Sequence, residues 1–559
     1  MLKMTKTTMS IIALFAVLAT SSAFAAPGAE PESIHLSWQN SPATTMTIMW
    51  WTNSGIAESL VEYGLDAGYG SQIAGTVEPL PEGRGNNHTV EITGLNPKTQ
   101  YHYRVGGGGI WSGDKTFETV ALPEDVCEPY RFVVLGDSRS SITVGASLYW
   151  STVLDAATDE DPLFIIFNGD AINDGDEQEE GWEDWFEKAH GDISTQPMMM
   201  VWGNHEHHGT SYFLNNFAMP VNDVTATEDF YDFQVGPIHF FSLDTEVQPY
   251  ATQATWLDNK LTGTSAIWTM ALNHRSTYSS GTTHGSADDN IDFWGPVFDA
   301  HHLDINIGSH DHIYERTKPI YGGTPIPNED YSQGTMYLVS GGAGAFCNPI
   351  LNIFNDFYLV GIGATHYILF EVEYNKLIMT VKSDLGIVYD SYTLEKPEIG
   401  FPTAEFVVVD PDNIYALEPA AFDAAASSDP CGEIIDYAWN FGDGQTGNGR
   451  DLTHVFSEEG SYTVRMVVTD IDGYGDETTA LVNVLPAQVD DDVNDDADDD
   501  VDDDVNDDIN DDVNDDADDD WVNDDTASDD DAVNDDASDD DTAEEAGDDD
   551  DDESGGCGC

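Results

Sequence analysis

Basic residues are scarce in this sequence. Its 559 residues include 18 Lys and Arg against 106 Asp and Glu, for a formal net charge of −88. Nucleic acids and anionic membranes are bound mainly through Lys and Arg, so neither is expected as a partner. A charge of this sign and size predicts a soluble, self-repelling surface.

Long apolar runs are limited to the N-terminus. Lys3 and Lys6 precede an apolar run, and an A-x-A pattern suited to cleavage ends at Ala25. We expect residues 1–25 to be a signal peptide and the mature protein to be secreted, periplasmic or held at the cell surface. No later stretch approaches the roughly 18 apolar residues of a membrane-spanning helix, so no transmembrane segment is expected.

Cysteine is also sparse. The five cysteines are Cys127, Cys347, Cys431, Cys557 and Cys559. Export permits disulfides, and an odd count leaves at least one thiol unpaired. A Cys127–Cys347 bridge is conceivable, although the pairing cannot be read from the sequence. Cys557 and Cys559 lie too far from any His to predict a zinc site.

The length of the chain requires several domains, because 559 residues exceed what one hydrophobic core supports. Residues 487–559 repeat Asp-rich units such as DDVNDDADDD and contain too few apolar residues to offset the entropy of ordering. This segment is therefore predicted to be a disordered tail. Its Asp residues could associate weakly with Ca²⁺, although it lacks the features of an EF-hand loop. A solvated spacer is the simpler interpretation.

Two segments contain short strands separated by turn signals, which is typical of β-sandwiches. Residues 30–121 resemble the fibronectin type III-like domain that precedes the catalytic domain in purple acid phosphatases, through VEYG, GLNPKTQYHYRVG and FET. Residues 400–486 resemble a PKD-type domain through YAWNFGDG, HVF and GSYTVRMVVTD. The second resemblance implies a spacer or a module that contacts a surface glycan or another protein.

The segment between them, residues 128–397, alternates apolar strand patterns with helical ones and predicts an α/β domain. Short apolar runs end at Gly136, Gly169 and Gly203, and a polar side chain follows each of them. Open α/β sheets place ligands beyond the carboxyl ends of their strands. The polar side chains are therefore expected to converge on one rim of the sheet.

Six side chains form the candidate set of metal ligands: Asp137, Asp170, Asn204, His274, His310 and His312. Mixed carboxylate, amide and imidazole sets suit Mn, Fe and Zn, and a carboxylate can bridge two ions roughly 3.5–4 Å apart. Asp170 is expected to bridge, with Asp137 on the first ion. Asn204 and His274 are expected on the second ion, and the two remaining His residues can reach different ions.

This ordered set carries a family resemblance. Residues 131–397 resemble a calcineurin-like metallophosphoesterase of the purple acid phosphatase branch through GNHE, NHRSTYSSG, THG, SHDHIYER and GTMYLVSGGAGA. The resemblance implies a β-sandwich flanked by helices, two divalent or trivalent metal ions (Fe, Mn or Zn) and hydrolysis of phosphate esters. It also implies that His205 contacts the phosphate or protonates the leaving oxygen, and that His284 contacts the substrate. The alternative for His284 is a solvated loop residue.

Two positions depart from the pattern of the family. Asn173 stands where purple acid phosphatases carry the Tyr that binds Fe(III) and gives the colour, and Arg139 stands where other members carry a His. The first ion therefore lacks an obvious fourth protein ligand. Water would fill that place, or less favourably His207 or His208. We expect a colourless protein with a weaker first metal site.

Arginine is rare in this chain, yet Arg139 and Arg275 both lie inside the metal motifs. Because a guanidinium matches phosphate oxygens with two parallel N–H groups, both are candidate substrate-binding residues, and Arg139 is a candidate phosphate clamp. The alternative for Arg139 is an ion pair that neutralises the Asp cluster.

The favoured function is a secreted hydrolase of phosphate monoesters, with a metal-activated hydroxide as nucleophile and His205 at the leaving group. Its partner would be a small phosphorylated substrate. The first alternative is a phosphodiesterase acting on nucleotide or lipid-headgroup diesters. The second is a surface binding protein with a degenerate hydrolase domain, and the six retained ligand positions argue against it.

Overall fold

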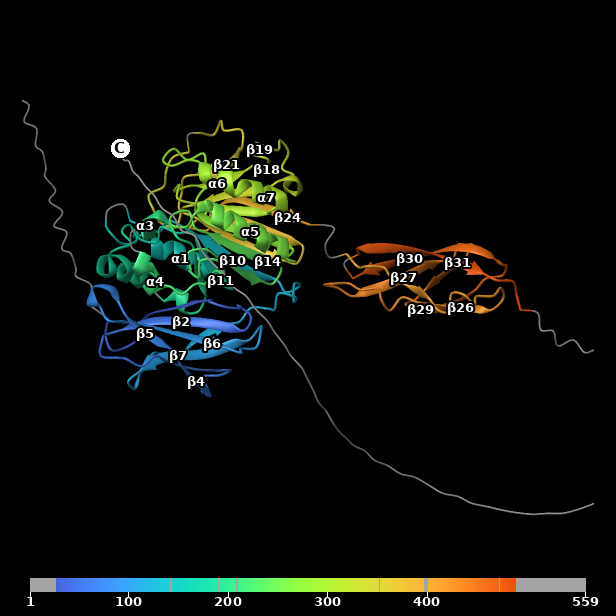
Figure 1. Cartoon of the computed structure of the whole chain (residues 1–559), viewed down its shortest axis with the longest axis horizontal. Helices are drawn as coiled ribbons and strands as arrows, with labels where there is room; N and C mark the ends of the chain where they lie inside the picture. Colours follow the sequence, from blue (N-terminus) through green and yellow to red (C-terminus); the bar gives the residue numbers. More distant parts are fainter. Residues whose placement is uncertain are drawn as a thin grey trace, which may run out of the picture. The chain divides into compact units, whose positions relative to one another are not determined.

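The structure is a computed structural model that describes residues 27–140, 143–189, 191–207, 210–350, 352–396, 401–471 and 473–488 (Figure 1). The expected signal peptide, the acidic tail from residue 489 onward and the last two cysteines lie outside these ranges. No helix within the described ranges is long and apolar enough to span a membrane.

The N-terminal segment folds into two sheets. One has the order β1 (Glu32–Ser37), β2 (Thr45–Thr52), β6 (Asn86–Thr93) and β5 (Thr76–Pro79). The other has the order β4 (Ser71–Ala74), β3 (Leu60–Gly64), β7 (Gln100–Gly107) and β8 (Ile110–Trp111), with β9 (Lys115–Glu118) paired to β7. All 8 residues of β2 are buried. The strand is covered on both faces, because Trp51 packs on Phe186 of the next domain with ring centroids 4.7 Å apart.

The central domain is built from two larger sheets. The first has the order β12 (Met198–Met200), β11 (Phe164–Phe167), β10 (Tyr130–Leu135), β22 (Tyr367–Glu373), β23 (Lys376–Lys382) and β24 (Val388–Glu395). The second has the order β13 (Tyr231–Val235), β14 (Ile238–Leu243), β15 (Trp268–Arg275), β16 (Ile305–Ser309), β20 (Met336–Ser340), β17 (Tyr314–Thr317) and β21 (Tyr358–Ile362). A small hairpin of β18 (Ile320–Tyr321) and β19 (Thr324–Pro325) follows β17.

These two sheets pack face to face through buried aromatic side chains. Phe132 and Phe164 of the first sheet meet Phe240 of the second at ring-centroid distances of 5.4 and 5.7 Å. Helices cover the outer faces of both sheets. On the first sheet lie α1 (Trp150–Thr158) and α2 (Glu183–Lys188), each with a Trp packed on Phe167 of β11. On the second sheet lie α5 (Tyr250–Gly263), α6 (Asp288–Phe293) and α7 (Gly295–His301) (Figure 1). The predicted β-sandwich flanked by helices is confirmed.

Parallel strands bring their carboxyl ends together in this domain. β10, β11 and β12 are parallel neighbours, and so are β15, β16 and β20. The segment after β12 forms two short helices, α3 (Asn204–His207) and α4 (Thr210–Asn216). The polar residues that the sequence places after apolar runs therefore follow parallel strands of both sheets, as expected for ligands at the end of an α/β sheet.

The N-terminal sandwich and the central domain share one hydrophobic core. His35 of β1 lies in their contact, where its ring nitrogens face the carbonyl oxygens of Ser33 at 2.7 Å and Asn216 at 2.8 Å. Arg84 adds a bidentate pair with Glu183, with N–O distances of 2.8 and 2.6 Å. The contact therefore combines apolar packing with buried polar bonds across the two domains.

The buried His35 predicts a pH dependence of stability. Burial lowers its pKa to about 4, against the opposing effect of the two carbonyl groups. The unfolded chain takes up a proton below the ordinary pKa of about 6.5, whereas the folded chain does so only near 4. The contribution of His35 is therefore complete above pH 6.5 and is lost as the pH falls towards 4, by about 2 kcal/mol at pH 5. Metal-free protein should show a smaller drop in melting temperature from pH 7 to pH 5 after His35→Gln; an equal drop would contradict this assignment.

The C-terminal described segment is a second sandwich with a core of its own around Trp439, Phe441 and Phe456. One sheet has the order β25 (Val407–Val408), β26 (Pro419–Asp423) and β29 (Asp451–Val455). The other has the order β28 (Thr446–Asn448), β27 (Ile434–Asn440), β30 (Gly460–Asp470) and β31 (Gly475–Val484). The predicted C-terminal β-sandwich is confirmed.

One disulfide links the segment before β10 to this second sandwich. It joins Cys127 to Cys431, whose Cα atoms are 5.3 Å apart, and Cys347 is a free thiol. The Cys127–Cys347 pairing that was considered from the sequence is therefore wrong. Pairing depends on Cα atoms coming within about 7 Å, which is a property of the tertiary fold and not of spacing along the chain.

Candidate metal centre

Three of the candidate ligands have an unusual backbone. Asp137 follows β10, Asp170 follows β11 and His310 follows β16, with φ values of 60°, 55° and 67°. Side-chain-bearing residues rarely adopt this left-handed region, and such strain is concentrated at functional sites. The strain is held by hydrogen bonds, since the Asp137 N–H donates to the Gly169 carbonyl at 3.0 Å and the His310 N–H donates to Asp137 Oδ2 at 2.9 Å.

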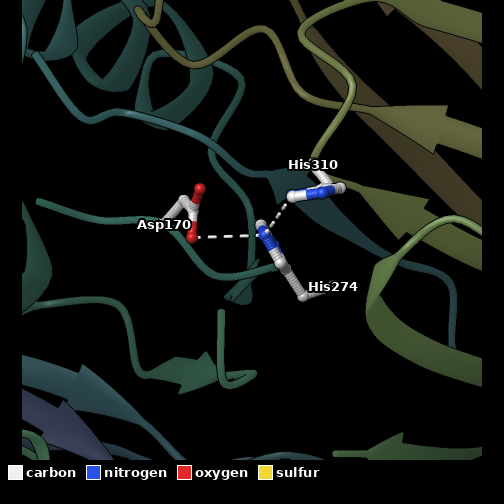
Figure 2. A group of neighbouring side chains, drawn as sticks. All are labelled: Asp170, His274 and His310. Atoms are coloured by element: carbon white, nitrogen blue, oxygen red, sulfur yellow. Dashed lines mark hydrogen bonds and ion pairs between the residues drawn. The ribbon is translucent and has the colours of Figure 1, made fainter. Parts of the chain in front are cut away.

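The first cluster consists of Asp170, His274 and His310 (Figure 2). His274 Nδ1 lies 2.9 Å from the Asn168 carbonyl oxygen, which only accepts, so Nδ1 carries a proton. Its Nε2 faces Asp170 Oδ1 at 3.2 Å and His310 Nδ1 at 3.1 Å. Asn204 Oδ1 approaches the same Nε2 at 3.1 Å. Carboxylate, amide and imidazole atoms that converge in this way suit a metal ion.

The second cluster consists of Asp137, Asp170 and His312. His312 Nδ1 lies 2.9 Å from the Phe346 carbonyl oxygen, which fixes the ring and turns Nε2 towards Asp137 Oδ1 at 3.4 Å. Buried polar atoms normally have a partner. Yet Asp137 Oδ1, His312 Nε2 and His310 Nε2 form no hydrogen bond within the described part of the chain. A bound cation would satisfy the first two, so this cluster also fits a metal ion.

Charges in the centre act strongly on one another. Burial alone lowers the pKa of His274, but the Asp170 carboxylate outweighs it and raises this pKa to about 10. Burial raises the pKa of the Asp170 carboxyl, yet His274 and other basic groups hold it well below its usual range. Burial and the neighbouring His274 together lower the pKa of His310. The carboxylates thus require positive charge at this point, which a cation would supply directly.

The ligands can converge because the backbone at Gly169 lies very close to Gly203 and His274. Gly169 has a φ of 84°, and a Cβ on it would lie 2.8 Å from both His274 Nδ1 and the Gly203 backbone. Such contacts are shorter than side-chain atoms tolerate. A glycine at the end of β11 is therefore needed to bring Asp170 against the strand end that carries His274.

Glu206 is a supporting residue to which the sequence assigned no role. Its side chain is buried and accepts three backbone N–H groups, from Asp170 and Gly203 through Oε2 at 2.8 and 2.9 Å, and from Ala171 through Oε1 at 2.8 Å. Burial and the nearby Asp170 raise its pKa to about 7. The GNHE motif was the available signal, since an acid three residues after a strand-ending glycine can bond back to that turn.

Asp311 is a second residue without a role in the sequence interpretation. Its Oδ2 accepts from Ser279 Oγ at 2.6 Å and from the Gly285 N–H at 2.9 Å, and its Oδ1 accepts from the His284 N–H at 3.2 Å. It therefore anchors the loop that carries His284. Its place between His310 and His312 could have drawn attention to it.

The predicted substrate residues His284 and Arg275 lie on one side of the centre. Both line a cavity of about 720 Å³ that also reaches His310. The His284 ring lies 3.7 Å, between centroids, from the His310 ring, and burial lowers its pKa. Arg275 is held by Glu246 through two bonds of 2.6 and 2.9 Å. This side of the centre can therefore admit a ligand next to the first cluster.

Family comparisons agree with this geometry. Residues 31–119 match the family model of the purple acid phosphatase N-terminal domain, residues 130–314 match calcineurin-like phosphoesterase and residues 401–484 match the PKD domain. The chain combines the N-terminal domain of purple acid phosphatases with a calcineurin-like phosphoesterase domain. Its family is one of hydrolases.

Relatives of this chain include proteins from a mycobacterium, from plants and from animals. Purple acid phosphatase 18 of Arabidopsis thaliana is 26% identical over 315 residues, covering 53% of this chain and 68% of its own. Acid phosphatase type 7 of Mus musculus is 27% identical over 367 residues, and the match covers 59% of this chain and 81% of the mouse protein. The solved structure of a purple acid phosphatase from yellow lupin seeds shares the fold, with a TM-score of 0.57 at 19% identity over 66% of this chain and 74% of that one.

The two departures from the family pattern contact each other in this metallophosphoesterase. Arg139 donates from Nε to Asp170 Oδ2 and from Nη1 to Asn173 Oδ1, both at 3.2 Å. His205 Nδ1 donates to the Asn173 carbonyl oxygen at 2.6 Å, and its Nε2 lies 3.7 Å from Asp170 Oδ2. The structure thus shows the ion pair that was the alternative for Arg139, and its role as a phosphate clamp stays a prediction. The His207 side chain and all of His208 lie outside the described residues.

Proposed function

We propose that this chain is a secreted phosphoesterase that hydrolyses phosphate monoesters at a centre of two metal ions. The observation that carries the proposal is the sharing of Asp170 by the two Asp–His clusters. A shared carboxylate is the arrangement that holds two ions close together.

The residues that would hold the ions follow from the two clusters. The first ion would be held by Asp137 and His312. The second ion would be held by His274, His310 and Asn204. Asp170 would bind both ions. When bound, Fe, Mn or Zn ions here would polarise the phosphoryl group and lower the pKa of a water molecule. The unpaired buried atoms of Asp137 and His312 support this assignment.

The remaining side chains would bind the substrate and move its protons. His205 faces Asp170 across 3.7 Å and would contact the phosphate or protonate the leaving oxygen. Arg139, already beside Asp170, would help to bind a phosphate dianion, and Arg275 and His284 would contact the substrate from the neighbouring cavity. Two guanidinium groups favour the doubly charged monoester over the diester.

The disulfide supports export of the protein. A Cys127–Cys431 bridge forms in oxidising compartments, in agreement with the sequence pattern of a cleaved leader. The PKD-type domain would then contact a surface glycan or another protein, and the acidic tail would at most associate weakly with Ca²⁺.

The test compares an aryl phosphate monoester with the matching diester. Full-length protein would be stripped of metal and reloaded with Mn²⁺, Zn²⁺ or Fe²⁺. We expect kcat/KM to be at least about tenfold higher for the monoester, roughly 1.4 kcal/mol of barrier, and the most active form to contain two ions per chain. Faster diester turnover would replace the proposal with a phosphodiesterase. Two bound ions without turnover would favour a binding protein.

The same preparations test the expectation that the protein is colourless, because this chain has Asn173 where purple acid phosphatases carry the iron-binding Tyr. Asn173 carries an amide and not a phenol, and its side-chain oxygen already accepts a hydrogen bond from Arg139. The iron-loaded protein is therefore expected to lack a tyrosinate–Fe(III) absorption band in the visible range. Such a band would show that another tyrosine serves as ligand.

A further inference from the structure

Three large apolar side chains are exposed on two loops beside the candidate metal centre. The exposed fractions are 83% for Leu148, 60% for Tyr149 and 76% for Phe346. Scattered apolar side chains are normal on a surface, but a gathered patch marks a binding site. We call Leu148, Tyr149 and Phe346 the apolar rim.

The loop that carries Phe346 is fixed to the centre. The Ala343 N–H donates to the Gly136 carbonyl and the Ala345 N–H to the Asp137 carbonyl, both at 2.9 Å. The Phe346 carbonyl oxygen faces His312 Nδ1, also at 2.9 Å. The backbone of Phe346 thus orients a candidate ligand while its ring stays in solvent. The Phe346 residue is therefore anchored, through its backbone, to the candidate metal centre.

The loop that carries Leu148 and Tyr149 lies against the first one. The Ser147 N–H donates to the Ser138 carbonyl at 2.7 Å, one residue from Asp137. A Cβ built on Gly344 would lie 3.3 Å from Ser147 Cβ and from the Tyr149 carbonyl carbon. The two loops are therefore in contact next to Gly344, two residues before Phe346 and directly at Tyr149.

We propose that the apolar rim binds an alkyl or aryl group esterified to the phosphate of the substrate. This inference rests on the proposed function and names its substrate class. Both loops are hydrogen-bonded to the Asp137–His312 cluster or to the residue next to it, so an apolar group on a phosphate held at the centre would have the rim within reach. The net charge of −88 opposes an anionic membrane surface as the occupant.

The experiment compares octyl phosphate with ethyl phosphate, whose leaving groups are chemically alike. Leu148→Ser/Phe346→Ser is expected to lower the octyl-to-ethyl ratio of kcat/KM about tenfold, because contacts with several methylene groups are lost. The matched control, Leu65→Ser/Leu481→Ser, removes leucines that are 67% and 66% exposed in the other two domains. It should leave the ratio unchanged. An equal loss for both esters, or an unchanged ratio in the rim variant, overturns the inference.

The affinities of metal-loaded protein for octylphosphonate and ethylphosphonate, measured by calorimetry, separate this inference from the proposed function. If no ester is hydrolysed but the rim variant binds octylphosphonate about tenfold more weakly, the apolar rim is supported and the proposed function fails. Phosphatidylcholine vesicles form the last arm. Vesicle binding that is lost in the rim variant, with an unchanged octyl-to-ethyl ratio, would assign the apolar rim to a membrane surface instead.

Discussion

Asp170→Asn is expected to lower kcat/KM by about 10³-fold or more, equivalent to roughly 4 kcal/mol of transition-state stabilisation. Asp170 is the carboxylate common to both Asp–His clusters, and its oxygens face His274 at 3.2 Å and Arg139 at 3.2 Å. An amide keeps the shape of the side chain but lacks the charge, and its nitrogen cannot coordinate as a carboxylate oxygen does. The variant should therefore lose affinity for both ions together.

The measurement combines turnover of the aryl monoester with metal content after dialysis. The matched control is Asp159→Asn, an exposed acid beyond α1 that removes the same charge away from the centre. It should retain full turnover and two ions. Loss of a single ion in Asp170→Asn, with the other ion fully retained, would contradict the bridging role. Turnover within tenfold of the native protein would contradict its role in the reaction.

Glu206→Ala is expected to lower the free energy of unfolding by about 3 kcal/mol or more and to impair metal binding. The substitution leaves the buried N–H groups of Asp170, Ala171 and Gly203 without their acceptor. Each such group costs about 1–3 kcal/mol when it loses its partner. The left-handed turn at Asp170 depends on these bonds, so loss of stability and loss of the centre should occur together.

Thermal unfolding of the metal-free protein measures the first effect, and metal content measures the second. Glu206→Gln keeps one acceptor oxygen and should fall between the native protein and Glu206→Ala. The matched control is Glu187→Ala, an exposed acid of α2, which should change the melting temperature little. A Glu206→Ala variant with native stability and two bound ions would show that the turn is held without this side chain.

The sequence by itself determined the domain types and the kinds of residue that meet at the candidate centre. Apolar runs that end in glycine and are followed by Asp, Asn or His are local patterns, and the strands they predict do carry these residues at their carboxyl ends. Parallel pairing of such strands brings their ends to one edge, so convergence followed from general rules of α/β sheets. Short strands separated by turn residues also predicted the β-sandwiches on both sides of the central domain.

Only the tertiary structure decided which residues are partners. Whether His310 or His312 joins Asp137 depends on the left-handed turn at His310, which sends two nearby rings to different clusters. Cys127 forms a disulfide with Cys431, which lies 304 residues away in the sequence. Arg139 donates a hydrogen bond to Asn173, and the spacing of these two residues in the sequence does not predict that contact. The GNHE motif hints that Glu206 bonds back to its own turn, but only the fold shows that it also accepts the N–H groups of Asp170 and Ala171. Partner choice is set by sheet order and loop contacts between distant segments, and local patterns do not contain that information.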